Sequence, residues 1–280
     1  MTAFDGAHKR LIARIANSLT LVCILLVAQL PAANVAVRYK EGLTHGFLVV
    51  STLDGDLIGE GDLTEVVHGN EITCRLTYHF KDGSLQDETT VYSQRRQFRL
   101  ISDHTVQKGP LFPEQSDVLI EMSSGKVTVR TVDKNGKEKT EDQKMKLPPD
   151  LANGLILTLL KNIPPGAEVP DLPMLVANPK PRIVKLKVSS AGKDPFLLAG
   201  SNREAIHYVI KVDIGGVAGV VAPLLGKQPP DSHVWILGGD VPTFVKSVTL
   251  AYIGGPLWTT ELLAPTWPKS PNPERKQEKQ

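Results

Sequence analysis

Cysteine is scarce in this 280-residue chain, which contains only Cys23 and Cys74. Cys23 lies in an apolar segment near the N-terminus, so a single cysteine remains if that segment is removed. An intramolecular disulfide is then impossible, and a zinc site built on cysteines has no partner set. Cys74 alternates with polar residues in a strand-like pattern, which predicts a small buried side chain rather than a reactive thiol.

An excess of charge of either sign is also missing. The chain has 32 basic and 30 acidic residues, a formal net charge of +2. Residues 1–33 contain Lys9, Arg10, Arg14 and Asp5, and their removal leaves equal numbers of basic and acidic residues. Proteins that bind nucleic acids usually carry a strong basic excess. The composition therefore predicts no nucleic-acid partner.

No hydrophobic run reaches the roughly 20 residues that a membrane-spanning helix requires. The N-terminal apolar run covers residues 15–30, with basic residues before it and Pro31-Ala32-Ala33 after it. This order is typical of a secretory signal peptide. We expect residues 1–33 to be removed and the protein to be exported, either periplasmic or secreted. The alternative is a protein anchored in the inner membrane by residues 15–30.

Signatures of common catalytic and cofactor sites are absent. No two histidines have the His-x-His or His-x-x-x-His spacing of a metal site, and no serine lies in a Gly-x-Ser-x-Gly elbow. Gly226-Lys227 is followed by Gln228 where a phosphate-binding loop needs Ser or Thr. The sequence predicts no metal, no cofactor and no catalytic residue.

Four carboxylates gather on one predicted hairpin: Asp54, Asp56, Glu60 and Asp62. Paired carboxylates can act as acid and base, or bind Ca²⁺ when a loop brings their oxygens together. The simpler interpretation is that Asp54 forms the turn and the others face water. A hydrolase using the Asp54–Asp62 cluster is therefore our third hypothesis, and it requires His45 or His104 to converge with these carboxylates in a polar cleft.

Short β-type runs separated by turn residues dominate the rest of the chain. Asp54-Gly55 and Asp82-Gly83 are strong hairpin signals, because glycine takes a positive φ without steric penalty. Residues 70–80 alternate apolar and polar side chains with the period of two that places one face on a core. Strands are predicted at 46–54, 57–67, 70–80, 84–93, 96–102, 117–122, 126–132, 137–145, 181–190, 194–200, 204–213, 232–238, 241–253 and 256–264.

One helix is predicted at about 150–162. Asp150 is a suitable N-cap, and Pro164-Pro165-Gly166 ends the pattern. Apolar residues at steps of four, with more beside them, form a broad stripe that requires burial. The charged strand 137–145 is expected at a solvated sheet edge. We predict a mainly β protein: one large curved antiparallel sheet, a half-barrel or open barrel, with one buried amphipathic helix.

The domain organisation follows from these elements. Residues 37–266 are expected to form a single antiparallel β domain, with the helix inside it. The tail 267–280 has almost no apolar residues and is predicted to be disordered.

Several features together resemble bacterial secreted families of unknown function. They are the Asp54-Gly55 hairpin leading to Gly59, the long antiparallel sheet, the helix after Pro148-Pro149-Asp150, and a late tryptophan strand that runs into Val241-Pro242. Those families are similar in architecture to periplasmic lipoprotein carriers. The resemblance implies a half-barrel with a helix packed in its concavity, and it implies no catalytic residues.

The leading functional hypothesis is a non-enzymatic envelope protein that binds an apolar ligand in the concavity of the sheet, such as a lipid, an acyl chain or a lipidated peptide. The glycine-rich apolar segment 214–226 is either core or a flap over such a ligand. The alternative is a structural or interaction module that contacts an envelope protein or a membrane surface, which a filled core would favour. The predicted ligand-binding residues are Leu155, Leu159, Ile163, Val217, Val220, Leu224, Trp235 and Trp258.

Overall fold

The computed structural model describes residues 35–177, 180–198, 200–214 and 228–263. These residues belong to one compact unit. The predictions made for the signal segment, for most of the apolar segment 214–226 and for the C-terminal tail lie outside the described residues. Within the described part of the chain, no helix is long and apolar enough to cross a membrane.

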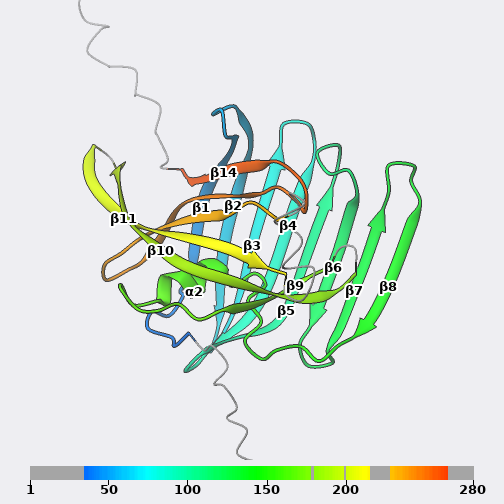
Figure 1. Cartoon of the computed structure of the whole chain (residues 1–280), viewed down its shortest axis with the longest axis horizontal. Helices are drawn as coiled ribbons and strands as arrows, with labels where there is room; N and C mark the ends of the chain where they lie inside the picture. The colour runs from blue at the N-terminus through cyan, green and yellow to red at the C-terminus, as the bar shows by residue number, and fades with distance from the viewer. Residues whose placement is uncertain (1–34, 178–179, 199, 215–227, 264–280) are drawn as a thin grey trace, which may run out of the picture. The chain divides into compact units, whose positions relative to one another are not determined.

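Fourteen strands in the described residues form one antiparallel sheet (Figure 1). The strands are β1 (Thr44–Thr52), β2 (Leu57–His68), β3 (Glu71–Phe80), β4 (Leu85–Gln94), β5 (Phe98–Lys108), β6 (Gln115–Glu121), β7 (Lys126–Val132), β8 (Glu138–Lys144), β9 (Leu172–Val176), β10 (Arg182–Leu198), β11 (Ser201–Asp213), β12 (Ser232–Leu237), β13 (Thr243–Leu250) and β14 (Leu257–Leu262). One α-helix, α2 (Ile156–Asn162), interrupts them between β8 and β9. The predicted mainly β fold with a single helix is confirmed.

The sheet consists of two runs of consecutive hairpins that meet at the pair β1–β14. Its order is β8-β7-β6-β5-β4-β3-β2-β1-β14-β13-β12-β11-β10-β9. Val50 of β1 lies opposite Thr260 of β14, so the first and last strands close the two runs into one sheet. The terminal strands β8 and β9 have no hydrogen-bonded partner on their outer sides within the described residues. The predicted charged strand is thus at a sheet edge, where charge opposes aggregation.

The early hairpins form where the Asp-Gly pairs predicted them. Gly55 has a φ of 91° and Gly83 a φ of 86°, values that residues with a Cβ rarely adopt. The backbone amide of Gly55 donates to Thr52 O at 3.1 Å, and that of Gly83 donates to Phe80 O at 3.0 Å. These local turns fix the register in which β1 pairs with β2 and β3 pairs with β4.

The second half of the sheet differs from the prediction in two places. Strand β9, sequence LPMLV, was not predicted, because a proline within a short apolar run argues against a strand. It lies at the edge of the sheet, where a missing amide hydrogen is tolerated. Residues 181–190 and 194–200 were predicted as separate strands, but β10 continues through them with a register shift between Ser190 and Gly192.

Helix α2 is shorter than predicted. The prediction of Asp150 as N-cap is wrong, since the N-cap is Leu155 and makes no side-chain capping hydrogen bond. Gly154 has a φ of 65° and lies against Thr90 and Asp103, so closely that a Cβ would clash with both side chains. The residues before the helix therefore form turns over the sheet, and helical geometry begins only at Ile156.

The sheet is strongly curved, because strands far apart in its order face one another. Side chains of β3, β4 and β5 line the same cavity as side chains of β9, β10, β11 and β12. Near the two free edges, Val129 of β7 and Lys139 of β8 line a small recess together with Ala177 and Pro181, which flank the β9–β10 turn. The inner face holds the core, including a stacked pair, Phe80 and Trp258, with ring centroids 5.2 Å apart.

Candidate functional site

The most prominent site in the described residues is a cavity of about 920 Å³ on the inner face of the sheet, partly open to solvent. This volume is at the upper end of the ~300–1,000 Å³ range of small-molecule sites. Most of its lining is apolar, which suits a ligand with little hydrogen-bonding capacity.

One wall of the cavity comes from β9 to β12 and is mostly apolar. Alternate residues point inward along each strand, because the side-chain period of a strand is two. Leu186 of β10 lies opposite Val212 of β11, which places both side chains side by side on this wall. Other apolar side chains of this wall are Met174, Val176, Val184, Ile210, Ile214 and Val234.

The cavity extends from the helix to the β13–β14 turn. Helix α2 contributes Ile156 and Leu157 to its lining, and the turn contributes residues 251–255. The Nε2 of Gln107, a cavity residue of β5, donates to Ala251 O at 3.3 Å, which joins the turn to the facing wall. A molecule with an extended apolar part therefore fits along this space, between the helix and the turn.

The facing wall carries a polar strip of four side chains on β4 and β5: Gln86, Glu88, Thr105 and Gln107. Register places Glu88 opposite Thr105, and Gln86 opposite Gln107. The two glutamines satisfy each other, since Gln107 Nε2 donates to Gln86 Oε1 at 2.9 Å. The strip lies on the same inward face as Leu76 and Tyr78 of β3, which continue the cavity wall.

Glu88 is the charged member of the strip. Burial, followed by the negative charge of nearby Asp103, raises the pKa of Glu88 to about 8. At neutral pH its carboxyl group is therefore largely protonated. Within the described residues, its side chain makes no hydrogen bond and no ion pair.

Asp103 on β5 lies opposite Thr90, which is two residues after Glu88 on β4. It lies beneath the turns that precede α2. Its side chain is 3% exposed and accepts a hydrogen bond from Thr90 Oγ1 at 2.8 Å. Burial raises the pKa of Asp103 to about 6, although the hydrogen bond from Thr90 acts against this. Gly154 covers the pair. Asp103 is thus closed off from the cavity, while its charge still acts on Glu88.

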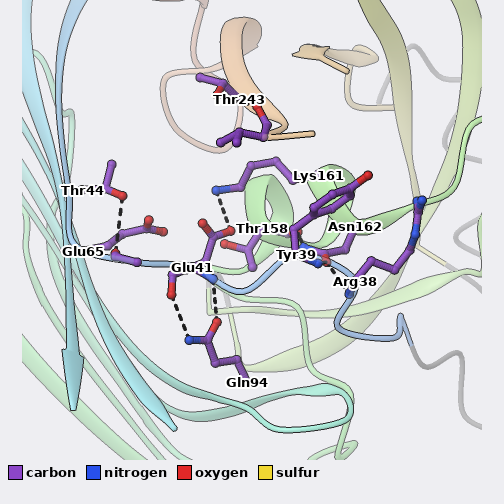
Figure 2. Close-up of polar contacts among 12 residues, drawn as sticks. Arg38, Tyr39, Glu41, Thr44, Glu65, Gln94, Thr158, Lys161, Asn162 and Thr243 are labelled. Carbon is purple, nitrogen blue, oxygen red and sulfur yellow. Dashed lines mark hydrogen bonds and ion pairs between the residues drawn. The ribbon is translucent and has the colours of Figure 1, made fainter. Parts of the chain in front are cut away.

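A second polar cluster joins the helix to the segment before β1 (Figure 2). Lys161 Nζ and Glu41 Oε1 are 2.6 Å apart, and only 13% and 12% of their side chains are exposed. Gln94 accepts from the backbone amide of Glu41 at 2.7 Å, and Asn162 Oδ1 accepts from the amide of Tyr39 at 2.7 Å. Burial raises the pKa of Glu65, which accepts a hydrogen bond from Thr44. Because its groups satisfy one another, we interpret this cluster as a structural clamp.

Of the predicted ligand-binding residues, Trp258 lines the cavity. Leu155, Leu159 and Ile163 do not, because they are 1%, 5% and 5% exposed and pack in the closed core. Val217, Val220 and Leu224 lie outside the described residues. Whether any of the predicted residues contacts a ligand, Trp258 included, stays a prediction.

Trp235 lies on the opposite face of the sheet. Its ring stacks on His207 at 4.3 Å, and its Nε1 donates to Asp194 Oδ2 at 2.7 Å. His207 Nε2 and His233 Nδ1 are 2.9 Å apart, and burial lowers the pKa of His207. These contacts account for Trp235 as part of an outer-face cluster, with no access to the cavity.

The Asp54–Asp62 cluster does not form a cleft with histidines. His45 Nε2 lies 2.8 Å from Asp62 Oδ1, and both side chains are about half exposed. His104 instead pairs with Asp117 at 2.9 Å. Within the described residues, no group of three or more His, Cys, Asp or Glu side chains is placed to hold a metal ion.

The strip residues Gln86 and Glu88 were missed by the sequence analysis. In β4, sequence LQDETTVYSQ, both faces carry polar residues, so alternation does not reveal which face is inside. The available signal in the sequence was the aromatic residue Tyr92, which shares the face of Gln86 and Glu88. In the structure its side chain is fully buried.

No family model matches the sequence, and a search of curated proteins found no match. Among solved structures, the chain is similar to a beta-barrel-like protein of the domain of unknown function DUF1849 from Brucella abortus. The two are 11% identical with a TM-score of 0.43, over 80% of this chain and 98% of that one. It is also similar to the hypothetical lipoprotein YmcC from Escherichia coli, at 8% identity and a TM-score of 0.32, over 81% of this chain and 87% of that one. At these sequence identities and TM-scores, no functional residue is carried over from either structure.

Proposed function

We propose that this protein is a non-enzymatic binder of a molecule with an extended apolar part, such as an acyl chain, which it holds inside the curved sheet. The observation that carries the proposal is the mostly apolar cavity of about 920 Å³ between β3–β5 and β9–β12. A filled interior would have favoured a purely structural module. The basic and apolar N-terminal pattern supports action outside the cytoplasm, after export.

The binding energy would come from removing apolar groups from water. Each CH₂ group that enters such a cavity contributes about 0.8 kcal/mol. Association itself costs ~4–15 kcal/mol in lost translational and rotational freedom. Short apolar molecules should therefore bind weakly, and chains of roughly a dozen carbons or more should bind measurably.

Two neighbouring substitutions on β11 test the proposal. Val212 lines the cavity, whereas Lys211 beside it is exposed on the opposite face. We expect Val212→Trp to fill the space and lower the affinity for a fluorescent long-chain alcohol, whose head group is uncharged, by at least about tenfold. Lys211→Trp, which adds the same side chain outside, should bind like the wild type. Thermal unfolding checks that both variants fold.

Native mass spectrometry of the protein isolated from cells provides a second measurement. A co-purifying molecule with a long apolar chain, lost on extraction with organic solvent and reduced in Val212→Trp, would support the proposal. Equal probe binding by both variants would contradict it, and so would the absence of binding by the wild type.

A further inference from the structure

We propose that the Glu88 carboxyl group forms an ion pair with a cationic amino group of the ligand. The cavity would then select amphiphiles that have an amine head and an apolar chain. This inference rests on the proposed function. The geometry that supports this is one carboxyl group on a short polar strip, inside a cavity whose lining is otherwise mostly apolar.

Glu88 stands out in the polar strip because the other three members have partners. Gln86 and Gln107 are hydrogen bonded to each other. The Thr105 side chain is hydrogen bonded to Asp103. Glu88 has neither a hydrogen bond nor an ion pair among the described residues, although it lines the cavity. Glu88 is half-buried, and a ligand group that hydrogen bonds to its carboxyl group inside the cavity would stabilise the bound state.

The charges around Glu88 favour a positive partner. Asp103 on β5 is the charged group that acts on it most directly, and its negative charge opposes ionisation of Glu88. On β3, Cys74 and Tyr78 face the same region; burial is the main cause that raises the pKa of both, and the negative charge of Glu88 adds to it. A carboxylate head would add a third acidic group here. An ammonium head would instead be attracted by two.

The one basic side chain among the residues lining the cavity does not neutralise Glu88. Arg182 of β10 also lines the space, but its Nη1 is hydrogen bonded to Lys180 O at 3.5 Å. The pKa of Glu88 responds to burial and to Asp103, with no contribution from Arg182. Arg182 therefore does not form an ion pair with Glu88.

Apolar burial and head-group recognition can be separated with ligands that share one chain. Dodecylamine, dodecanol and dodecanoate carry the same alkyl chain and differ in the head group. Their affinities are measured below the micelle concentration, by isothermal titration calorimetry near neutral pH. We expect the wild type to bind dodecylamine at least about tenfold more tightly than dodecanol, because the attraction between the two charges is stronger in a mostly apolar cavity than in water. Dodecanoate should bind most weakly.

The variant Glu88→Gln keeps the shape of the side chain and removes its charge. We expect it to lose the preference for dodecylamine and to bind dodecanol within about twofold of wild type. Glu60→Gln, which removes an exposed carboxylate on β2, should change neither affinity. Amine binding by the wild type should also release close to one proton, seen as a buffer-dependent heat, since Glu88 must ionise to form the pair. Glu88→Gln should release almost none.

The outcomes distinguish this inference from the proposed function. If dodecanol binds but dodecylamine is not preferred, or if Glu88→Gln leaves the preference intact, the amine assignment is overturned while chain binding stands. A preference for dodecanoate overturns it as well. If no ligand of the series binds to the wild type, the proposed function falls and this inference falls with it.

Discussion

A carboxyl group that faces an apolar cavity couples the stability of the fold to pH. Glu88 has a pKa of about 8 in the folded protein, against an ordinary value of 4.5. Between these values, the unfolded chain has lost the proton and the folded protein still holds it. The stabilisation is therefore complete below about pH 4.5 and is lost as the pH rises through 8. Asp103 and Glu65 also have raised pKa values, so a substitution at position 88 is needed to isolate the share of Glu88.

We expect Glu88→Gln to flatten the pH dependence of stability. Relative to the variant, the wild type should lose free energy of unfolding between about pH 4.5 and pH 8, because only the wild type must ionise a carboxyl group that faces the cavity. Urea unfolding at several pH values measures this difference. The buried Asp103 is present in both proteins, which makes the comparison specific to Glu88. A parallel pH dependence in the two would show that Glu88 is solvated in the folded state.

At the scale of elements, helix α2 separates the closed core from the open cavity. Leu155 and Leu159 pack into the core, while Ile156 and Leu157 line the cavity. A helix rotates by about 100° for each residue, so neighbouring positions face different environments. The two sides of one short helix should therefore respond differently to the same truncation.

We expect Leu159→Ala to destabilise the protein by about 2–5 kcal/mol, since it leaves a cavity in packed surroundings. Its effect on ligand affinity should be small. Leu157→Ala should cost clearly less stability and should weaken the binding of a long-chain ligand, because its side chain contacts the cavity. Chemical unfolding and probe titration on both variants check this. Equal loss of stability in the two would argue against the open cavity beside Leu157.

At the scale of the whole molecule, the β1–β14 pair joins two runs of hairpins that are otherwise sequential. Thr260 in β14 is opposite Val50 of β1 and Ser247 of β13, and its side chain is 2% exposed. Both runs also contribute walls to the same cavity. The cavity therefore exists only while this junction is intact, and we expect the described unit to unfold in a single transition.

Proline substitutions test how much a central strand and a terminal strand each contribute to the stability of the sheet. We expect Thr260→Pro to destabilise the whole protein by about 3 kcal/mol or more, since it removes a hydrogen bond and distorts a central strand. Thr140→Pro, in the terminal strand β8, should have a much smaller effect. Circular dichroism during urea unfolding measures both. A Thr260→Pro protein that loses only part of its structure would show that the two runs fold independently.

The sequence alone determined the local parts of this fold. The Asp-Gly pairs at Gly55 and Gly83 set tight turns, and these set the neighbouring registers, because turn chemistry acts over a few residues. Alternation in residues 70–80 identified the inward face of β3 correctly: Tyr78 and Phe80 are both buried. The charged strand at an edge and the existence of one helix followed from composition and periodicity in the same way.

Only the tertiary structure decided where the cavity lies and which residues face it. The helix carries apolar side chains on more than one face, so spacing alone favoured Leu159 where the cavity has Leu157. Strand β4 is polar on both faces, so nothing local placed Glu88 inside. The pairing of β1 with β14 joins residues about two hundred positions apart. Such contacts depend on how a curved sheet brings distant strands together, and no short-range pattern encodes that curvature.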